Sequence, residues 1–355
     1  MIRRFSICMA VLGILSTVLG CGDDQITHTL LDEEKDFYAS APEMAGFRTT
    51  GRVMVRVFYV EPDDHTRPAG YKNKIRRVVV ETRRFFADQM EQHEHGRKTF
   101  DVHRNDERRI SVTPITLDEN AEFYENMKFG ELTEHIAWKT WEEPYADEFP
   151  INGEWRTNVF VIALPYERMN ACKAQRVCRP TRGLARGGKH QHQGSAWVLD
   201  RSLNKNLLAH ELGHTTGLEH DFSDDSFVMS YVNNHSKKLS RESAKWLDRS
   251  RAFNHRREQI IDAPVVGDMR ASSTMLTVTL LPNSDRQSAF YDYGVLLNLN
   301  GYGDYPEVIG YSTSVRRVRR DIYIVRITSA IPKDVRNVEL RLIGSDSNIL
   351  YHSPE

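Results

Sequence analysis

The chain has 355 residues, 40% of them hydrophobic, and its 48 Lys and Arg side chains almost balance its 49 Asp and Glu side chains. This length is ample for two modest domains. The near-neutral charge excludes the class of strongly basic nucleic-acid-binding proteins, so we expect no nucleic-acid partner.

The amino terminus is typical of an export signal. Arg3 and Arg4 precede an apolar stretch, residues 5–19, which is too short for a comfortable membrane span but long enough for a secretory signal. Val-Leu-Gly-Cys at residues 18–21 resembles a bacterial lipobox, which implies that Cys21 becomes the lipidated first residue of the mature chain. The alternative is a simple cleaved signal in which Cys21 is incidental.

We therefore expect a signal peptide and lipobox over residues 1–21 and a flexible acidic tether over residues 22–48. The lipid would make the membrane a partner of the protein without a spanning segment. The predicted location is the bacterial cell envelope, after export, at the outer membrane or cell surface.

Strand and helix patterns alternate over residues 49–257. β-Branched and aromatic residues predict strands over residues 53–60, 110–117 and 158–164, and apolar residues at helical spacing predict helices over residues 72–92 and 122–141. This order predicts a mixed sheet crossed by two long helices.

Two cysteines lie in the body of this region. Cys172 and Cys178 are six residues apart, and in an exported protein such a pair predicts a small disulfide loop. Free thiols or metal ligands are the alternatives.

The most informative segment is HELGHTTGLEH, residues 210–220. His210 and His214 are four residues apart and project from one face of a helix, so both can bind one ion. Gly217 can end that helix, because glycine adopts a positive φ at little cost, and the chain can then turn back to supply His220 as a third ligand.

Three histidine ligands leave a fourth position open, which is typical of a catalytic zinc site. Glu211 is next to the first ligand, where a general base is needed to take a proton from water. With 14 His in the chain, a bare HExxH pattern arises by chance in roughly 4% of chains this long, and the added Gly and third His lower that to about one in ten thousand. An ordinary helix with surface histidines is therefore disfavoured.

A turn sequence follows the third histidine at residues 227–231, Phe-Val-Met-Ser-Tyr. With the histidine motif it resembles the metzincin metallopeptidases, which place a methionine turn beneath the zinc ligands. The resemblance implies that Met229 is that structural methionine and that Tyr231 stabilises the oxyanion. The branch stays open, because Asp221 is similar to the adamalysin branch and the Met-Ser-Tyr turn to serralysins and astacins.

The resemblance also implies an edge strand, before the zinc helix, along which an extended peptide substrate lies. We assign Leu184 and Ala185 to that strand. A calcium ion near Asp221, Asp224 and Asp225, as in some relatives, is not favoured because no fixed ligand loop is visible.

The remaining elements are a helix and a run of short strands. Ser240 can cap a helix that continues to Asn254. Strands are predicted over residues 276–281, 293–299, 321–328 and 338–343, separated by turn-forming residues. The overall fold class is α+β, with a metzincin-like domain over residues 49–257 and a small all-β sandwich over residues 258–355.

The sequence as a whole predicts a secreted, lipid-anchored zinc metalloendopeptidase that acts on a protein or peptide, with His210, His214 and His220 as metal ligands and Glu211 as general base. One alternative is a catalytically silent, zinc-containing surface or adhesion lipoprotein, in which the carboxy-terminal domain does the binding. Another is a metal-handling lipoprotein. The sequence gives no oligomeric state.

Overall fold

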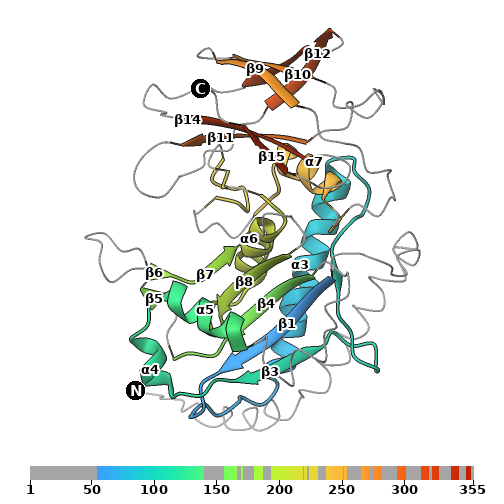
Figure 1. Cartoon of the computed structure of the whole chain (residues 1–355). Coiled ribbons are helices and arrows are strands. Elements are labelled where there is room, and N and C mark those ends of the chain that lie inside the picture. Colours follow the sequence, from blue (N-terminus) through green and yellow to red (C-terminus); the bar gives the residue numbers. More distant parts are fainter. Residues whose placement is uncertain are drawn as a thin grey trace, which may run out of the picture.

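The computed structural model describes residues 54–139, 156–165, 169–170, 180–186, 193–218, 220–221, 224–230, 237–250 and 252–253, and seven strands between residues 265 and 352 (Figure 1). The predicted signal peptide, the tether, Cys21, Cys172, Cys178 and Tyr231 lie outside these residues.

A six-stranded mixed sheet forms the centre of the amino-terminal part. Its strand order is β2-β1-β4-β8-β7, β3 also pairs with β1, and every pairing is parallel except that of β7 with β8. The strands are β1 (Met54–Glu61), β2 (Asp101–Val102), β3 (Val112–Thr116), β4 (Arg156–Ile162), β7 (Gly183–Arg186) and β8 (Gln193–Leu199). The strands predicted over residues 53–60, 110–117 and 158–164 are thus confirmed as β1, β3 and β4.

Both faces of this sheet are covered, which explains why its strands are nearly continuous apolar runs. In β1, Val57 and Tyr59 belong to one core cluster and Phe58 and Val60 to another. Helices α3 (Tyr71–Gln92) and α6 (Lys205–Thr215) cover the first face, whereas α4 (Ala121–Glu125) and α5 (Phe129–Lys139) cover the second (Figure 1). The helix predicted over residues 72–92 is confirmed as α3.

The single helix predicted over residues 122–141 is wrong. The chain forms two shorter helices, α4 and α5, and residues 140–141 lie outside the described part. Between them the Asn126 amide donates to the Glu122 carbonyl, and the Lys128 backbone N–H donates to the Glu131 carboxylate as in half of a capping box. Trp138, in the last turn of α5, is 72% exposed. Only one long helix, α3, crosses the sheet in the described residues.

Shorter elements link these parts. Strands β5 (Met169–Asn170) and β6 (Pro180–Thr181) pair with each other, and a 3-10 turn, η1 (Asp200–Ser202), leads from β8 towards α6. No helix among the described residues has the length and hydropathy needed to cross a membrane.

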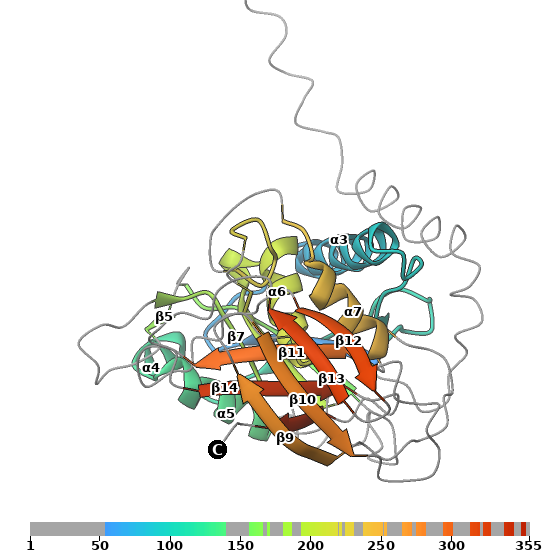
Figure 2. The same ribbon diagram turned by 90° about the horizontal axis from the view of Figure 1, so that it is seen from above.

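Helix α7 (Arg241–Arg249) begins at Ser240, whose hydroxyl accepts a hydrogen bond from the Ser243 backbone N–H. It ends at Ser250, before the predicted end at Asn254, because the chain at Ser250 is extended. Two antiparallel sheets follow, with β11 next to α7. Figure 1 draws one sheet above the other, and Figure 2, seen from above, shows them overlapping.

The first of these sheets has the order β12-β13-β10-β9 and the second β11-β14-β15. Their bounds are β9 (Val265–Ala271), β10 (Met275–Leu281), β11 (Gly294–Asn300), β12 (Thr313–Arg319), β13 (Ile322–Ile327), β14 (Asn337–Ile343) and β15 (Ile349–His352). The four predicted strands correspond to β10, β11, β13 and β14, whereas β9, β12 and β15 were not predicted.

Candidate metal centre

Helix α6 carries the first two predicted ligands, His210 and His214. It begins at Asn204, whose side-chain oxygen accepts hydrogen bonds from the backbone N–H groups of Asn206 and Leu207. Its buried residues Leu208, Ala209 and Leu212 join the first core cluster. The helix is therefore fixed at its start and along one face before it reaches the site.

The end of α6 reverses the chain towards the third ligand. The Leu218 N–H donates to the Gly213 carbonyl and the Gly217 N–H donates to the His214 carbonyl, each over 3.0 Å. Gly217 has a φ of 87°. These are the two bonds and the left-handed residue of a Schellman motif, which ends a helix by turning the chain back.

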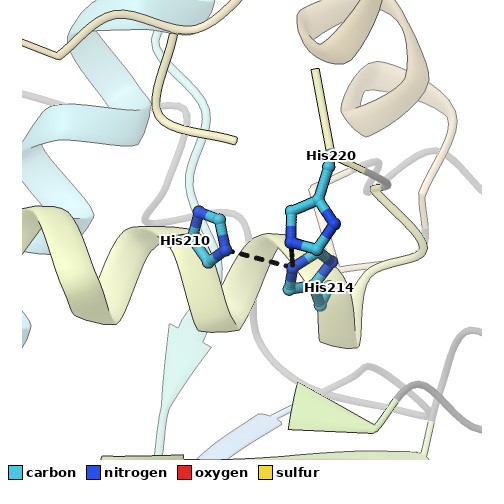
Figure 3. Close-up of side chains that lie close together, drawn as sticks. All are labelled: His210, His214 and His220. Atoms are coloured by element: carbon cyan, nitrogen blue, oxygen red, sulfur yellow. Dashed lines mark hydrogen bonds between the residues drawn. The ribbon is translucent and has the colours of Figure 1, made fainter. Parts of the chain in front are cut away.

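The three histidines converge on one point (Figure 3). The Nε2 atom of His214 lies 3.2 Å from that of His210 and 3.0 Å from that of His220. Two nitrogens bound to the same tetrahedral zinc at about 2.05 Å are about 3.3 Å apart, so the observed spacing fits one ion.

Backbone carbonyls fix which nitrogen faces the centre in two of the rings. His210 Nδ1 lies 2.8 Å from the Val228 carbonyl, and His214 Nδ1 lies 2.8 Å from the Leu218 carbonyl. A carbonyl only accepts, so both Nδ1 atoms carry the hydrogen and both Nε2 atoms present a lone pair to the centre. The donors are therefore oriented as metal ligands require.

Burial keeps two rings of the triad, His210 and His220, neutral. It lowers the pKa of His210 to about 4, with a smaller contribution from the charge of Lys237. Burial, followed by the neighbouring His210, lowers the pKa of His220 to about 3. Neutral imidazole is the form that binds a metal ion, so the triad could hold one at neutral pH. In the described residues it is the one group of His, Cys, Asp and Glu side chains close enough together to do so.

Met229 lies directly beneath α6. It is 1% exposed, and a β-carbon added at Gly213 would lie 2.6 Å from its sulfur atom. The Met229 carbonyl accepts a hydrogen bond from the N–H of Asp221, the residue after His220. Within the turn, the Ser230 N–H donates a hydrogen bond to the Phe227 carbonyl. The turn that contains Met229 thus contacts both the ligand helix and the segment of the third ligand.

Glu211 is 5% exposed, and burial raises the pKa of its carboxyl to about 8. Its side chain extends onto Gly183 in β7, where an added β-carbon would lie 2.6 Å from Oε1. The sequence patterns gave no reason to single out Gly183 or Gly213. Their importance comes from contacts between segments that are distant in the sequence.

The structure places Leu184 and Ala185 in β7, the terminal strand of the sheet order, antiparallel to β8. Ala185 packs against the core cluster that includes α6, and Leu184 packs against the opposite cluster. Of the acidic residues after the third ligand, Asp224 accepts hydrogen bonds from Ser226 and forms an ion pair with Lys238. Tyr231 lies outside the described residues, so its predicted role has no geometry here.

Solved structures with a similar fold include crystal structures of OgpA from Akkermansia muciniphila. The wild-type protein, in one crystal form, aligns with 86% of this chain and 93% of its own at a TM-score of 0.57 and 13% identity. A catalytically inactive OgpA, in complex with an O-glycopeptide substrate called glycodrosocin, aligns over the same shares at a TM-score of 0.56 and 13% identity.

This similarity shows a shared fold. The aligned 86% exceeds the share of the chain that residues 1–257 occupy, so the alignment extends into the carboxy-terminal strands. No protein-family model matches the chain, and no curated protein matches its sequence.

Proposed function

We propose that this protein is a zinc metalloendopeptidase of the metzincin type. The observation that carries the proposal is a set of three histidine nitrogens that face a common point, with buried Glu211 next to His210 on the same helix. Histidine triads with an open fourth position and a neighbouring base are typical of hydrolytic zinc sites. A mixed α/β fold shared with OgpA, an enzyme with an O-glycopeptide substrate, supports the proposal.

His210, His214 and His220 would hold the ion. When bound, zinc would supply Lewis acidity, which polarises a carbonyl and lowers the pKa of water. Two of the rings need no further adjustment, because the Val228 and Leu218 carbonyls already orient them.

Glu211 is the general base. In its ionised form, which the charge of a bound zinc ion would favour, this carboxyl group takes a proton from the attacking water as the new C–O bond forms, and it passes that proton to the leaving nitrogen as the peptide C–N bond breaks. The products are a carboxylic acid and an amine, and Glu211 is regenerated. We further assign Tyr231, from its place two residues after Met229, as a donor to the oxyanion.

The substrate would lie along β7. This strand is at the end of the sheet order, so it could pair with an extended peptide through main-chain hydrogen bonds. A peptide is the general substrate class, and an O-glycopeptide is the specific candidate because one is a substrate of the similar protein OgpA.

The test is cleavage of matched quenched peptides, one with an O-linked sugar and one without, by purified zinc-loaded protein. Glu211→Gln with equal zinc content is the control, because it keeps the side-chain shape and removes the base. We expect the parent to cleave and the variant to be about 100- to 10,000-fold slower. Cleavage of the glycosylated peptide alone would support the specific candidate, and cleavage of both would support a general endopeptidase.

No cleavage of either peptide or of a diverse peptide library would favour the alternative, a zinc-containing surface lipoprotein that binds without cleaving.

Lipid attachment at Cys21 is a separate proposal, supported by the apolar residues 5–19 and the lipobox-like residues 18–21. Metabolic labelling with a tagged fatty acid tests it. Label should enter the parent and be absent from Cys21→Ser.

A further inference from the structure

Gly183 has no side chain where the end of Glu211 lies against β7. A β-carbon at Gly183 would lie 2.6 Å from Oε1, 2.9 Å from Cδ and 3.0 Å from Cγ of Glu211. All three atoms belong to the outer half of that side chain. The end of Glu211 therefore occupies the space that any other residue at position 183 would need.

The backbone does not require glycine here. The glycines with positive φ in the described residues are Gly70, Gly96 and Gly217, and Gly183 is not among them. Alanine could adopt the Gly183 conformation, so the constraint on this position is the contact with Glu211. This separates Gly183 from the glycine that ends α6.

Glu211 has little freedom to give way. It is 5% exposed and sits on α6 between His210 and Leu212, the latter in the core cluster. A new methyl group would either strain the contact between α6 and β7 or turn the carboxylate away from its present position. The first outcome lowers stability, and the second moves the base.

We propose that Gly183 is a positioning residue that sets where the Glu211 carboxylate lies. This inference rests on the proposed function, and it makes β7 serve two purposes. The strand that would receive the peptide main chain also provides the surface against which the base rests. Base and substrate would then be located relative to the same short segment, as catalysis by proximity requires.

The test is a double-mutant cycle on the metal-free, full-length protein. Gly183→Ala is compared in the parent and in Glu211→Ala, with the thermal unfolding midpoint as the readout. We expect Gly183→Ala to lower the midpoint when Glu211 is present and to have little effect when residue 211 is alanine. An equal loss in both backgrounds would mean that the methyl group meets something else, and it would overturn the proposal.

Gly96→Ala is the matched control. Gly96 has a φ of 78° and nothing within 4 Å of an added β-carbon, so alanine there is strained only by its backbone conformation and should lose the same amount in both backgrounds. It should also leave activity unchanged. This control accounts for the general effect of a glycine-to-alanine change.

Kinetics complete the test. In the zinc-loaded protein, Gly183→Ala should lower kcat by about 10- to 100-fold while KM and zinc affinity stay near the parent values. An unchanged kcat would overturn the positioning role. If the parent itself turns over no peptide, the proposed function fails, yet the unfolding cycle still decides whether Gly183 and Glu211 are coupled.

Discussion

His210 donates its Nδ1 hydrogen to the backbone carbonyl of Val228, the residue before Met229, over 2.8 Å. The first ligand is therefore oriented by the turn that contains Met229, although the ligand itself belongs to α6. The second ligand is oriented by Leu218, and the third follows at His220. An ion bound by all three would connect α6, the chain reversal after it and the turn.

Zinc should therefore stabilise the whole region. We expect zinc at a thousandfold excess over its dissociation constant to stabilise the protein by about 4 kcal/mol, and His214→Ala to lose most of this effect. Thermal unfolding with and without zinc measures it. His65→Ala is the control, because His65 contacts the Tyr59 hydroxyl outside the triad and should keep the zinc effect. Equal zinc shifts in both variants would contradict the site.

Gly217→Ala should cost about 1–2 kcal/mol, because alanine disfavours the left-handed conformation that Gly217 adopts at a φ of 87°. Gly217→Asn should cost less, since asparagine tolerates that conformation. Zinc affinity should fall in the same order, because the reversal at Gly217 leads to His220. Urea unfolding and zinc titration test both statements, and an alanine variant as stable as the asparagine one would argue against this account.

Gly213→Ala places a methyl group against Met229. The added carbon would lie 2.6 Å from the methionine sulfur and 3.3 Å from the Leu218 side chain. Overpacking of this kind costs about 1–3 kcal/mol. The loss should shrink when Met229 is also changed to alanine, as measured by chemical unfolding of all four proteins. An additive pair would show that Met229 does not limit this position.

Asp248 should make stability depend on acidity. Burial raises the pKa of its carboxyl, but hydrogen bonds from His95 and Lys98 outweigh burial and hold the pKa well below its usual range. Because the folded-state pKa is depressed, this stabilisation is fully present above the ordinary carboxyl pKa of about 4 and is lost as the pH falls below that value.

Asp248→Asn should therefore cost about 2 kcal/mol near pH 7, and its difference from the parent should narrow as the pH falls from about 4 towards the depressed folded-state pKa. Urea unfolding near pH 7 and over the acidic range checks this. Asp88→Asn is the control, because Asp88 forms an exposed ion pair with Arg97 and should cost less than about 1 kcal/mol. A constant difference across the pH range would refute the assignment.

The metal ligands were predictable because their geometry is local. His210, His214 and His220 lie in one short segment, and helical spacing together with one glycine is enough to bring them together. The buried strands β1 and β4 and the amphipathic α3 were predictable for a similar reason, since a periodic pattern reports directly which faces are covered.

Contacts between distant segments were not predictable. No sequence pattern near Gly183 predicts its contact with Glu211, and none near Gly213 predicts its contact with Met229. The hydrogen bond to the Val228 carbonyl involves the backbone, so it does not depend on which side chain is at that position. The break between α4 and α5 depends on a local competition, in which Glu131 satisfies the Lys128 N–H and starts a new helix. Strand β12 was not predicted because its arginines interrupt the alternation of apolar and polar residues that is typical of a strand.

The position of β7 at the end of the sheet order also bears on self-association. A terminal strand that accepts an extended peptide is equally open to the same strand of a second molecule, and edge-to-edge pairing of this kind is a common start of aggregation. β7 spans only Gly183–Arg186, and short edge strands offer little length for such pairing. A strand this short would therefore limit pairing between two copies of the protein. Such pairing would otherwise compete with the substrate for β7.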